Sequence, residues 1–243
     1  SNHWPPLAYM AWKDQNGQYA TLARHFEPVY GSASYLIRWP QFLTNLPPNQ
    51  PLPDDYDKLM PVNGLARIRR GPKSISVLRN RDRFFTYRHG AAVINAVRFA
   101  SAFFGKAQFS SKTLEKRGNS YVMTQDLDAG YYQPFTPPRK VTTETYDNTR
   151  EQRERTEICR LHYEVTVTET PQGCDLKIEA TGTDDVPLAI EINLREGMTI
   201  TGAEKLGQFK DTWLLKQGTA EITAGRDTIQ IGPGLGLHTH AGV

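Results

Sequence analysis

Two histidines near the C-terminal end have the spacing of a metal site. His238 and His240 are separated by a single residue, and residues i and i+2 of a strand point to the same side. Such a pair could supply two ligands to a divalent metal ion. The sequence identifies no third ligand, so a solvated polar strand end is the alternative.

A second candidate is His89, which follows Arg88 in the stretch Tyr87-Arg88-His89-Gly90. Neighbouring cations disfavour the charged imidazole, so His89 could act as a general base near neutral pH. The long strand expected after it carries a further cation, Arg98. Ordinary cross-strand hydrogen bonding is the alternative for all of these side chains.

Two adjacent tyrosines follow an acidic turn at residues 126–130. A tyrosine ring can stack on a sugar, and its phenol can act as an acid or a base in a lyase. We therefore take Tyr132, with His89, as a candidate catalytic residue and Tyr131 as a candidate sugar contact. Tyrosine is also a common strand residue, so a purely structural role stays open.

Glu191 stands between the apolar residues Ile190 and Ile192. Alternation along a strand sends it to the face opposite theirs. There it would belong either to a cross-strand ion pair or to a polar binding surface. In the second case Glu191, Arg88, Arg98 and Tyr131 would contact the substrate.

Most catalytic signatures are missing. The chain has no phosphate-binding glycine loop, no Gly-x-Ser-x-Gly elbow, no His-Glu-x-x-His motif and no dinucleotide fingerprint. It does have a dense group of basic residues: Arg67, Arg69, Arg70, Lys73, Arg79, Arg81, Arg83 and Arg88. This group could attract an acidic polymer, or it could be a solvated strand face. Without an aromatic RNA-binding signature or zinc-finger spacing, nucleic acid is not an expected partner.

The elements that must position these residues are mainly strands. From about residue 65 the apolar residues alternate with polar ones, which predicts ten to twelve antiparallel strands forming a large β-sandwich. Before them, residues 19–26 and 34–43 have helical spacing, and the second helix should break at Trp39-Pro40. We expect a helical lead-in at 1–46, a proline-rich linker at 47–64 and the sandwich at 65–243. An exposed loop or strand edge is expected at 149–157, although helix propensity would permit one turn there. Hairpin turns are expected at 217–218 and 224–227, and a bend at 232–236.

Composition is consistent with a folded chain. The 243 residues are 38% hydrophobic with a formal net charge of +3, and no apolar run is long enough to span a membrane. Cys159 and Cys174 should be free thiols, because a hairpin turning at 171–173 separates them by far more than disulfide reach. The abrupt C-terminal end predicts a sandwich truncated there and a longer parent protein.

The whole pattern resembles bacterial heparinase II/III-like proteins. The resemblance is carried by the stretch from Gly64 to Gly71, by Asn80-Arg81-Asp82-Arg83-Phe84-Phe85, by residues 97–105 and by residues 186–191. Those proteins combine an incomplete α/α-toroid with a β-supersandwich similar to that of galactose mutarotases and polysaccharide lyases. The resemblance implies that residues 1–46 end a toroid and that the sandwich packs on a helical domain missing here.

The same resemblance implies that the chain binds or degrades acidic polysaccharide in the periplasm or outside the cell. Active members commonly carry a His-Gly-His-Ala-Asp-like stretch in the sandwich. Here the comparable residues are Arg88-His89-Gly90-Ala91-Ala92, with one histidine and no aspartate. The expected function is therefore a sandwich domain that is catalytically incomplete alone. The alternative is a non-catalytic carbohydrate-binding or structural module, with no cofactor other than the divalent metal considered above.

Overall fold

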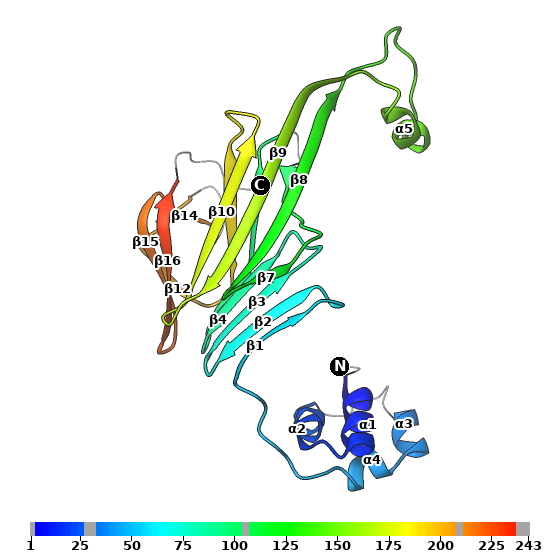
Figure 1. The fold of residues 1–243 in the computed structure, drawn as a ribbon, viewed down its shortest axis with the longest axis vertical. Helices are drawn as coiled ribbons and strands as arrows, with labels where there is room; N and C mark the ends of the chain where they lie inside the picture. Colours follow the sequence, from blue (N-terminus) through cyan, green and yellow to red (C-terminus); the bar gives the residue numbers. More distant parts are fainter. Residues whose placement is uncertain (1–2, 27–32, 104–106, 208–210, 237–243) are drawn as a thin grey trace. The chain divides into compact units, whose positions relative to one another are not determined.

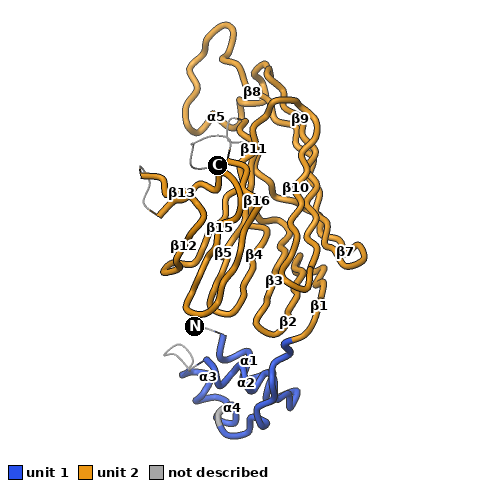
Figure 2. The backbone as a smooth tube through the Cα atoms, turned by 90° about the vertical axis from the view of Figure 1, so that its left-hand side faces the viewer, with its two compact units in different colours: residues 1–54 blue, residues 55–243 orange. Residues whose placement is uncertain are grey.

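The computed structural model describes residues 3–26, 33–103, 107–207 and 211–236 (Figure 1). The chain divides into two compact units, Ser1–Asp54 and Asp55–Val243 (Figure 2). Short helices make up the first unit and antiparallel sheets most of the second. The predicted fold class, mainly β with a few short N-terminal helices, is confirmed.

The first unit contains four short helices: α1 (Trp4–Asp14), α2 (Gly17–His25), α3 (Ala33–Arg38) and α4 (Gln41–Thr44). The sequence prediction missed α1, although prolines in a first helical turn, like those here, cost no hydrogen bond. The predicted break at Trp39-Pro40 is confirmed, because α3 ends just before it and α4 begins just after it. The small core of this unit consists of buried side chains of α1, α2 and α4: Trp4, Ala8, Ala23 and Phe42.

The first part of the predicted linker lies along α2. Thr21 Oγ1 donates to the Gln50 carbonyl at 2.7 Å, and Arg24 Nη1 donates to the Pro47 carbonyl at 2.9 Å. The two backbones approach closely at Gly17, where an added Cβ would lie 2.5 Å from the Pro48 carbonyl oxygen. Only glycine allows this approach without displacing the chain.

The largest sheet, sheet A, contains seven strands. In spatial order they run β1-β2-β3-β4-β5-β11, with β6 paired to β5: β1 (Asp55–Met60), β2 (Leu65–Arg70), β3 (Lys73–Leu78), β4 (Phe85–His89), β5 (Ala92–Ser101), β11 (Leu188–Leu194) and β6 (Ala107–Gln108). The sheet begins at Asp55 and not at Leu65. The second half of the predicted linker was therefore wrong, because residues 55–60 pair along the whole length of β2.

A four-stranded sheet, sheet B, has the order β10-β9-β8-β7. Its strands are β7 (Glu115–Arg117), β8 (Ser120–Tyr132), β9 (Arg155–Glu169) and β10 (Cys174–Gly182). Between β8 and β9 the chain forms the helix α5 (Thr143–Arg150). The prediction of an exposed loop or strand edge at 149–157 was therefore only partly right. Both cysteines are free, as predicted.

The remaining strands form two small sheets: β12 (Thr199–Thr201), β15 (Gln217–Ala224) and β16 (Asp227–Leu235) in one, β13 (Glu204–Lys205) and β14 (Trp213–Leu214) in the other. The predicted turn at 224–227 is confirmed, because Ala224 and Asp227 face each other across it. The turn at 217–218 and the bend at 232–236 were wrong. Gln217 and Gly218 pair with Leu235 and Gly234 near the ends of the two strands, and residues 232–235 belong to β16.

Sheets A and B pack face to face through large aromatic side chains. The Phe99 ring stacks on Phe109 at 4.6 Å between centroids and meets the edge of Tyr163 at 5.2 Å. The buried Tyr163 hydroxyl, on sheet B, donates to Ser101 Oγ on sheet A at 2.8 Å. Because each ring is fully or almost fully buried, this cluster joins the two layers of the sandwich.

A polar contact joins the same two sheets at their edge. Asp57 of β1 accepts hydrogen bonds from Tyr121 of β8 and from Lys116 Nζ at 2.5 Å. Burial alone would raise the pKa of Asp57, but these two bonds outweigh it and hold the pKa below its usual value. The carboxylate is therefore the stable form in the folded protein.

This contact predicts a loss of stability in acid. A depressed folded pKa stabilises the protein above the ordinary aspartate pKa of about 3.9. That stability is lost as the pH falls through the folded value. We expect that in Asp57→Asn the free energy of unfolding decreases less steeply as the pH falls. Urea titration at several pH values measures this dependence. The exposed Asp184→Asn serves as a control that keeps the wild-type slope, and an unchanged slope in Asp57→Asn would contradict the contact.

Candidate functional site

One face of sheet A brings together three arginines around small hydroxyl side chains. In the strand register Ser74 of β3 lies between Arg69 of β2 and Arg88 of β4. One row along, Ser76 lies between Arg67 and Thr86 in the same way. Alternation places all of them on the side of the sheet opposite to the buried Ile75 and Val77. We call this surface the arginine face: Arg67, Arg69, Arg88, Ser74, Ser76 and Thr86.

The three arginines have no carboxylate partner among the described residues. Arg67 Nη2 lies 3.4 Å from Ser74 Oγ, and Arg88 Nε donates to the Gly90 carbonyl at 2.6 Å. The nearby carboxylate of Asp227 instead accepts the amide of Ala91 at 2.8 Å. The positive charge of this face is therefore not neutralised within the described part of the chain.

The basic residues of the opposite face are bound differently. Arg70 Nη2 and Lys73 Nζ each lie 3.0 Å from a carboxylate oxygen of Glu169 on sheet B. Lys73 is almost fully buried there. Within β2, β3 and β4, strand alternation thus separates Arg70 and Lys73, which share a carboxylate, from Arg67, Arg69 and Arg88, which have no carboxylate partner among the described residues.

The arginine face has a regular spacing. Arg67 and Arg69 are two residues apart on one strand, about 7 Å, and Arg88 is two strands away from Arg69, about 10 Å. The two rows continue onto β1, where Tyr56 lies opposite Arg69 and Lys58 opposite Arg67. A linear anion lying across the strands would therefore meet cations and one aromatic ring, because Ser74 and Ser76 between the arginines are buried.

Arg98 and Glu191 do come together. They are paired residues of β5 and β11, and Arg98 Nη2 lies 2.6 Å from Glu191 Oε2. The hydrogen bond to Glu191 raises the pKa of Arg98 further above its ordinary value. Of the two alternatives, the structure shows the ion pair. Because each charge is neutralised by the other, the pair adds no net charge to the surface.

Arg88 and His89 do not share a surface. They are neighbours on β4, so their side chains point to opposite sides of sheet A. His89 pairs with Lys73 on the core-facing side. Its Nδ1 atom is buried without a hydrogen-bond partner in the described structure.

Tyr131 and Tyr132 lie at the end of β8, opposite Thr156 and Arg155 of β9. The other end of β8 starts at Ser120, beside the β9–β10 hairpin that contacts Lys73. Twelve residues of strand span about 40 Å. The structure therefore does not bring Tyr132 to His89, and these two candidate catalytic residues do not form one site with the predicted substrate contacts Arg88 and Tyr131.

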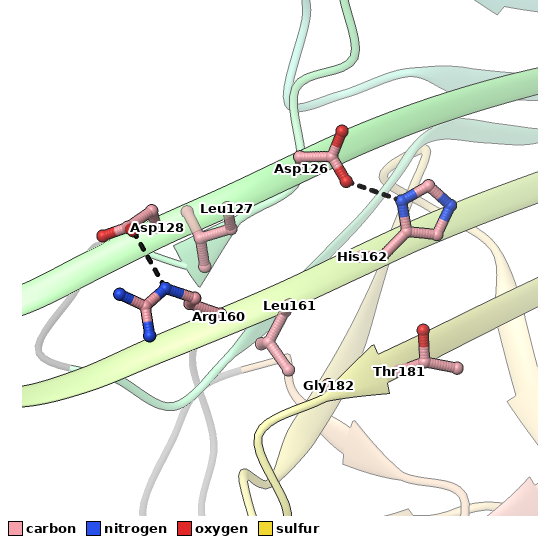
Figure 3. Close-up of a pocket in the computed structure, with 8 residues that line it drawn as sticks. All are labelled: Asp126, Leu127, Asp128, Arg160, Leu161, His162, Thr181 and Gly182. Atoms are coloured by element: carbon pink, nitrogen blue, oxygen red, sulfur yellow. Dashed lines mark hydrogen bonds and ion pairs between the residues drawn. The ribbon is translucent and has the colours of Figure 1, made fainter.

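A shallow hollow of about 440 Å³ lies on the solvent side of sheet B (Figure 3). Its charged side chains form pairs between β8 and β9. His162 Nδ1 lies 2.7 Å from Asp126, and Arg160 Nε lies 3.2 Å from Asp128 (Figure 3). A hydrogen bond from Arg155 and contact with Arg160 lower the pKa of Asp128. With its charges satisfied, the hollow offers less to a charged ligand than the arginine face.

The predicted metal ligands His238 and His240 lie outside the described residues. Within the described ranges, no group of three His, Cys, Asp or Glu side chains is placed to hold a metal ion. None of the helices described is long and apolar enough to cross a bilayer.

The sequence prediction noted the basic group but did not resolve the arginine face within it. The signal was available, because Arg67 and Arg69 alternate with Ala66 and Ile68. What alternation alone could not supply was the register that places Arg88 level with Arg69 across β3.

Comparison of the chain with protein-family models, with curated proteins and with solved structures gives no match. The resemblance to heparinase II/III-like proteins therefore remains a prediction that rests on the residues carrying it. The fold and the arginine face define the chain as a mainly β protein with a cationic sheet surface that has no carboxylate partner in the part of the chain that the structure describes.

Proposed function

We propose that this chain is a binding module for acidic polysaccharide and that the arginine face holds the polymer. The observation that supports this is the convergence of Arg67, Arg69 and Arg88 on one side of sheet A without carboxylate partners among the described residues. A guanidinium fork donates two parallel hydrogen bonds to a carboxylate or sulfate. Of the hydroxyl residues between the arginines, Ser74 and Ser76 are buried, so only the partly exposed Thr86 is placed to exchange hydrogen bonds with a sugar hydroxyl.

A binding role is favoured over a complete lyase. β-Elimination needs a base beside the bound uronate and a group that neutralises its carboxylate. His89 and Tyr132 are separated by most of the length of β8, and His89 points away from the arginine face. The proposal therefore keeps the polysaccharide-handling role implied by the heparinase-like resemblance, with a periplasmic or extracellular location, and assigns no catalysis to this chain.

The test compares wild type with the triple variant Arg67→Ser, Arg69→Ser, Arg88→Ser on immobilised heparin, alginate and polygalacturonate. We expect affinity for the preferred glycan to fall at least about tenfold, or about 1.4 kcal/mol. The remaining binding should depend less on salt, because fewer charges are paired with the polymer. Affinity is measured by biolayer interferometry at low and at physiological salt.

The matched control removes three positive charges from residues that already have carboxylate partners: Arg117→Ser, Lys177→Ser and Lys216→Ser. It should bind within about twofold of wild type, since partnered surface charges contribute little. Equal losses in both triple variants would show that only net charge matters and would overturn the assignment. Tighter binding to DNA or RNA than to every glycan would show that the arginine face binds nucleic acid instead of polysaccharide. Unsaturated uronate product, detected by ultraviolet absorbance, would overturn the non-catalytic role.

A further inference from the structure

The helix α5 lies at the far end of the long β8–β9 ribbon (Figure 1), and a second group of arginines belongs to this helix and to the residues after it. The chain leaves β8 after Tyr132, forms α5 and returns to β9 at Arg155. No side chain of α5 is buried. The usual apolar core is therefore not what holds this helix in place.

Arginine side chains stacked on aromatic rings take the place of that core. Arg153 lies 4.9 Å from the centroid of the Tyr146 ring and 5.7 Å from that of Phe135. Arg150 lies 5.5 Å from the Tyr132 ring centroid. In such cation–π contacts the face of the guanidinium lies over the face of the ring. The N–H groups at the edge of the guanidinium can then donate hydrogen bonds to other acceptors.

Those acceptors are missing from the described structure. Arg150 Nε, Arg153 Nε and Arg153 Nη2 are all buried with no hydrogen-bond partner. A buried donor left without an acceptor loses the hydrogen bond that it makes to water in the unfolded chain, which is unfavourable. Three such donors lie in the segment between β8 and β9 that contains α5. They therefore indicate a position at which an acceptor binds.

The geometry of the unpartnered atoms selects the acceptor. Nε–H and Nη2–H lie on one edge of the guanidinium and point the same way, so they match two oxygens of a single oxyanion. We propose that Arg153, assisted by Arg150, forms an oxyanion site at the tip of the ribbon. The site takes a carboxylate or a sulfate group.

Access to this site requires a small local displacement. Tyr146 covers Arg153 from α5, and its side chain is 48% exposed. Because α5 buries no side chain, moving it away exposes no apolar core, and segments of this kind open at low free-energy cost. An oxyanion that enters would satisfy the donors while the Phe135 ring, which lies outside α5, stays behind the Arg153 guanidinium.

The site does not depend on the proposed function, because the arginine face belongs to the other sheet. Its test is an NMR titration of the full chain that follows the arginine side-chain Nε–Hε signals. Sodium acetate and sodium sulfate are compared with sodium chloride at matched ionic strength. We expect saturable shifts of the Arg150 and Arg153 signals with acetate or sulfate and none with chloride. The better of the two salts distinguishes a carboxylate site from a sulfate site.

Arg153→Lys keeps the charge but removes the fork, so the Arg150 signal should respond at least about fivefold more weakly. Arg139→Lys is the matched control. Arg139 stacks on the same Phe135 ring, 3.6 Å from its centroid, but its Nη2 already donates to Gln152 Oε1 at 2.7 Å. Shifts that follow chloride equally, or an equal loss in Arg139→Lys, would overturn the site. Loss of glycan binding in the arginine-face triple variant, with these shifts unchanged, would separate the two proposals.

Discussion

Replacing Phe99 with alanine is expected to lower the free energy of unfolding by about 3–5 kcal/mol, the range found when a large buried aromatic is truncated. Phe99 is 1% exposed and contacts Phe84, Phe109 and Tyr163 at once. Its removal leaves a cavity at the point where sheets A and B meet. Neighbouring side chains cannot fill that cavity without leaving their own contacts.

Urea denaturation followed by fluorescence measures this loss. Phe99→Leu keeps most of the volume and should cost less than about 1.5 kcal/mol. Leu235→Ala, at a side chain 79% exposed, should stay within about 0.5 kcal/mol of wild type. If Phe99→Ala were no more destabilising than Leu235→Ala, the aromatic cluster would not be what joins the two sheets.

The strands with clean alternation were the ones that the sequence could predict. In β9, Leu161, Tyr163, Val165 and Val167 are buried, and the polar residues between them face outward, as expected. A single apolar face is enough to predict which side of such a strand is buried. A shift of one residue in the pairing register would expose all of its apolar side chains to water. β2 and β4 alternate in the same way, whereas β3 and β5 bury residues on both faces.

The missed elements are those whose stability comes from tertiary partners. β1 reads Asp-Tyr-Asp-Lys-Leu-Met and follows a proline-rich stretch, so its own sequence does not favour a strand. It is held by pairing with β2 and by the bonds from Tyr121 and Lys116 to Asp57. In the same way, Gly218 and Gly234 are typical of turns but pair with each other across β15 and β16.

The sequence predicted which residue types contribute to the candidate site but not how they are arranged in space. The density of arginines allowed either an acidic polymer or a solvated strand face, and the pairing of Glu191 was among the alternatives for that residue. The expected site that combines His89 with Tyr132 is not formed, because β4 and the end of β8 belong to different sheets. The sequence alone does not reveal this sheet order. Residue types indicate chemistry, but register and sheet order decide which residues meet.

The second large effect is expected for Glu169→Gln, which removes the carboxylate shared by Arg70 and Lys73. The Lys73 side chain is only 9% exposed, and its other contacts are the carbonyls of Thr170 and Gly173. Leaving a buried ammonium without its counter-charge costs about 3–5 kcal/mol. The glutamine amide cannot replace the lost charge at either partner.

Two comparisons separate this cost from ordinary surface electrostatics. Glu115→Gln breaks the exposed pair with Arg117 and should cost less than about 1 kcal/mol in the same urea titration. The double variant Lys73→Met, Glu169→Leu removes both buried charges and should recover most of the loss. Because Glu169 neutralises only the inward-facing cations, folded Glu169→Gln protein should bind acidic polysaccharide as wild type does. A fall in its affinity comparable to that of the arginine-face variant would show that the two faces of sheet A do not act separately.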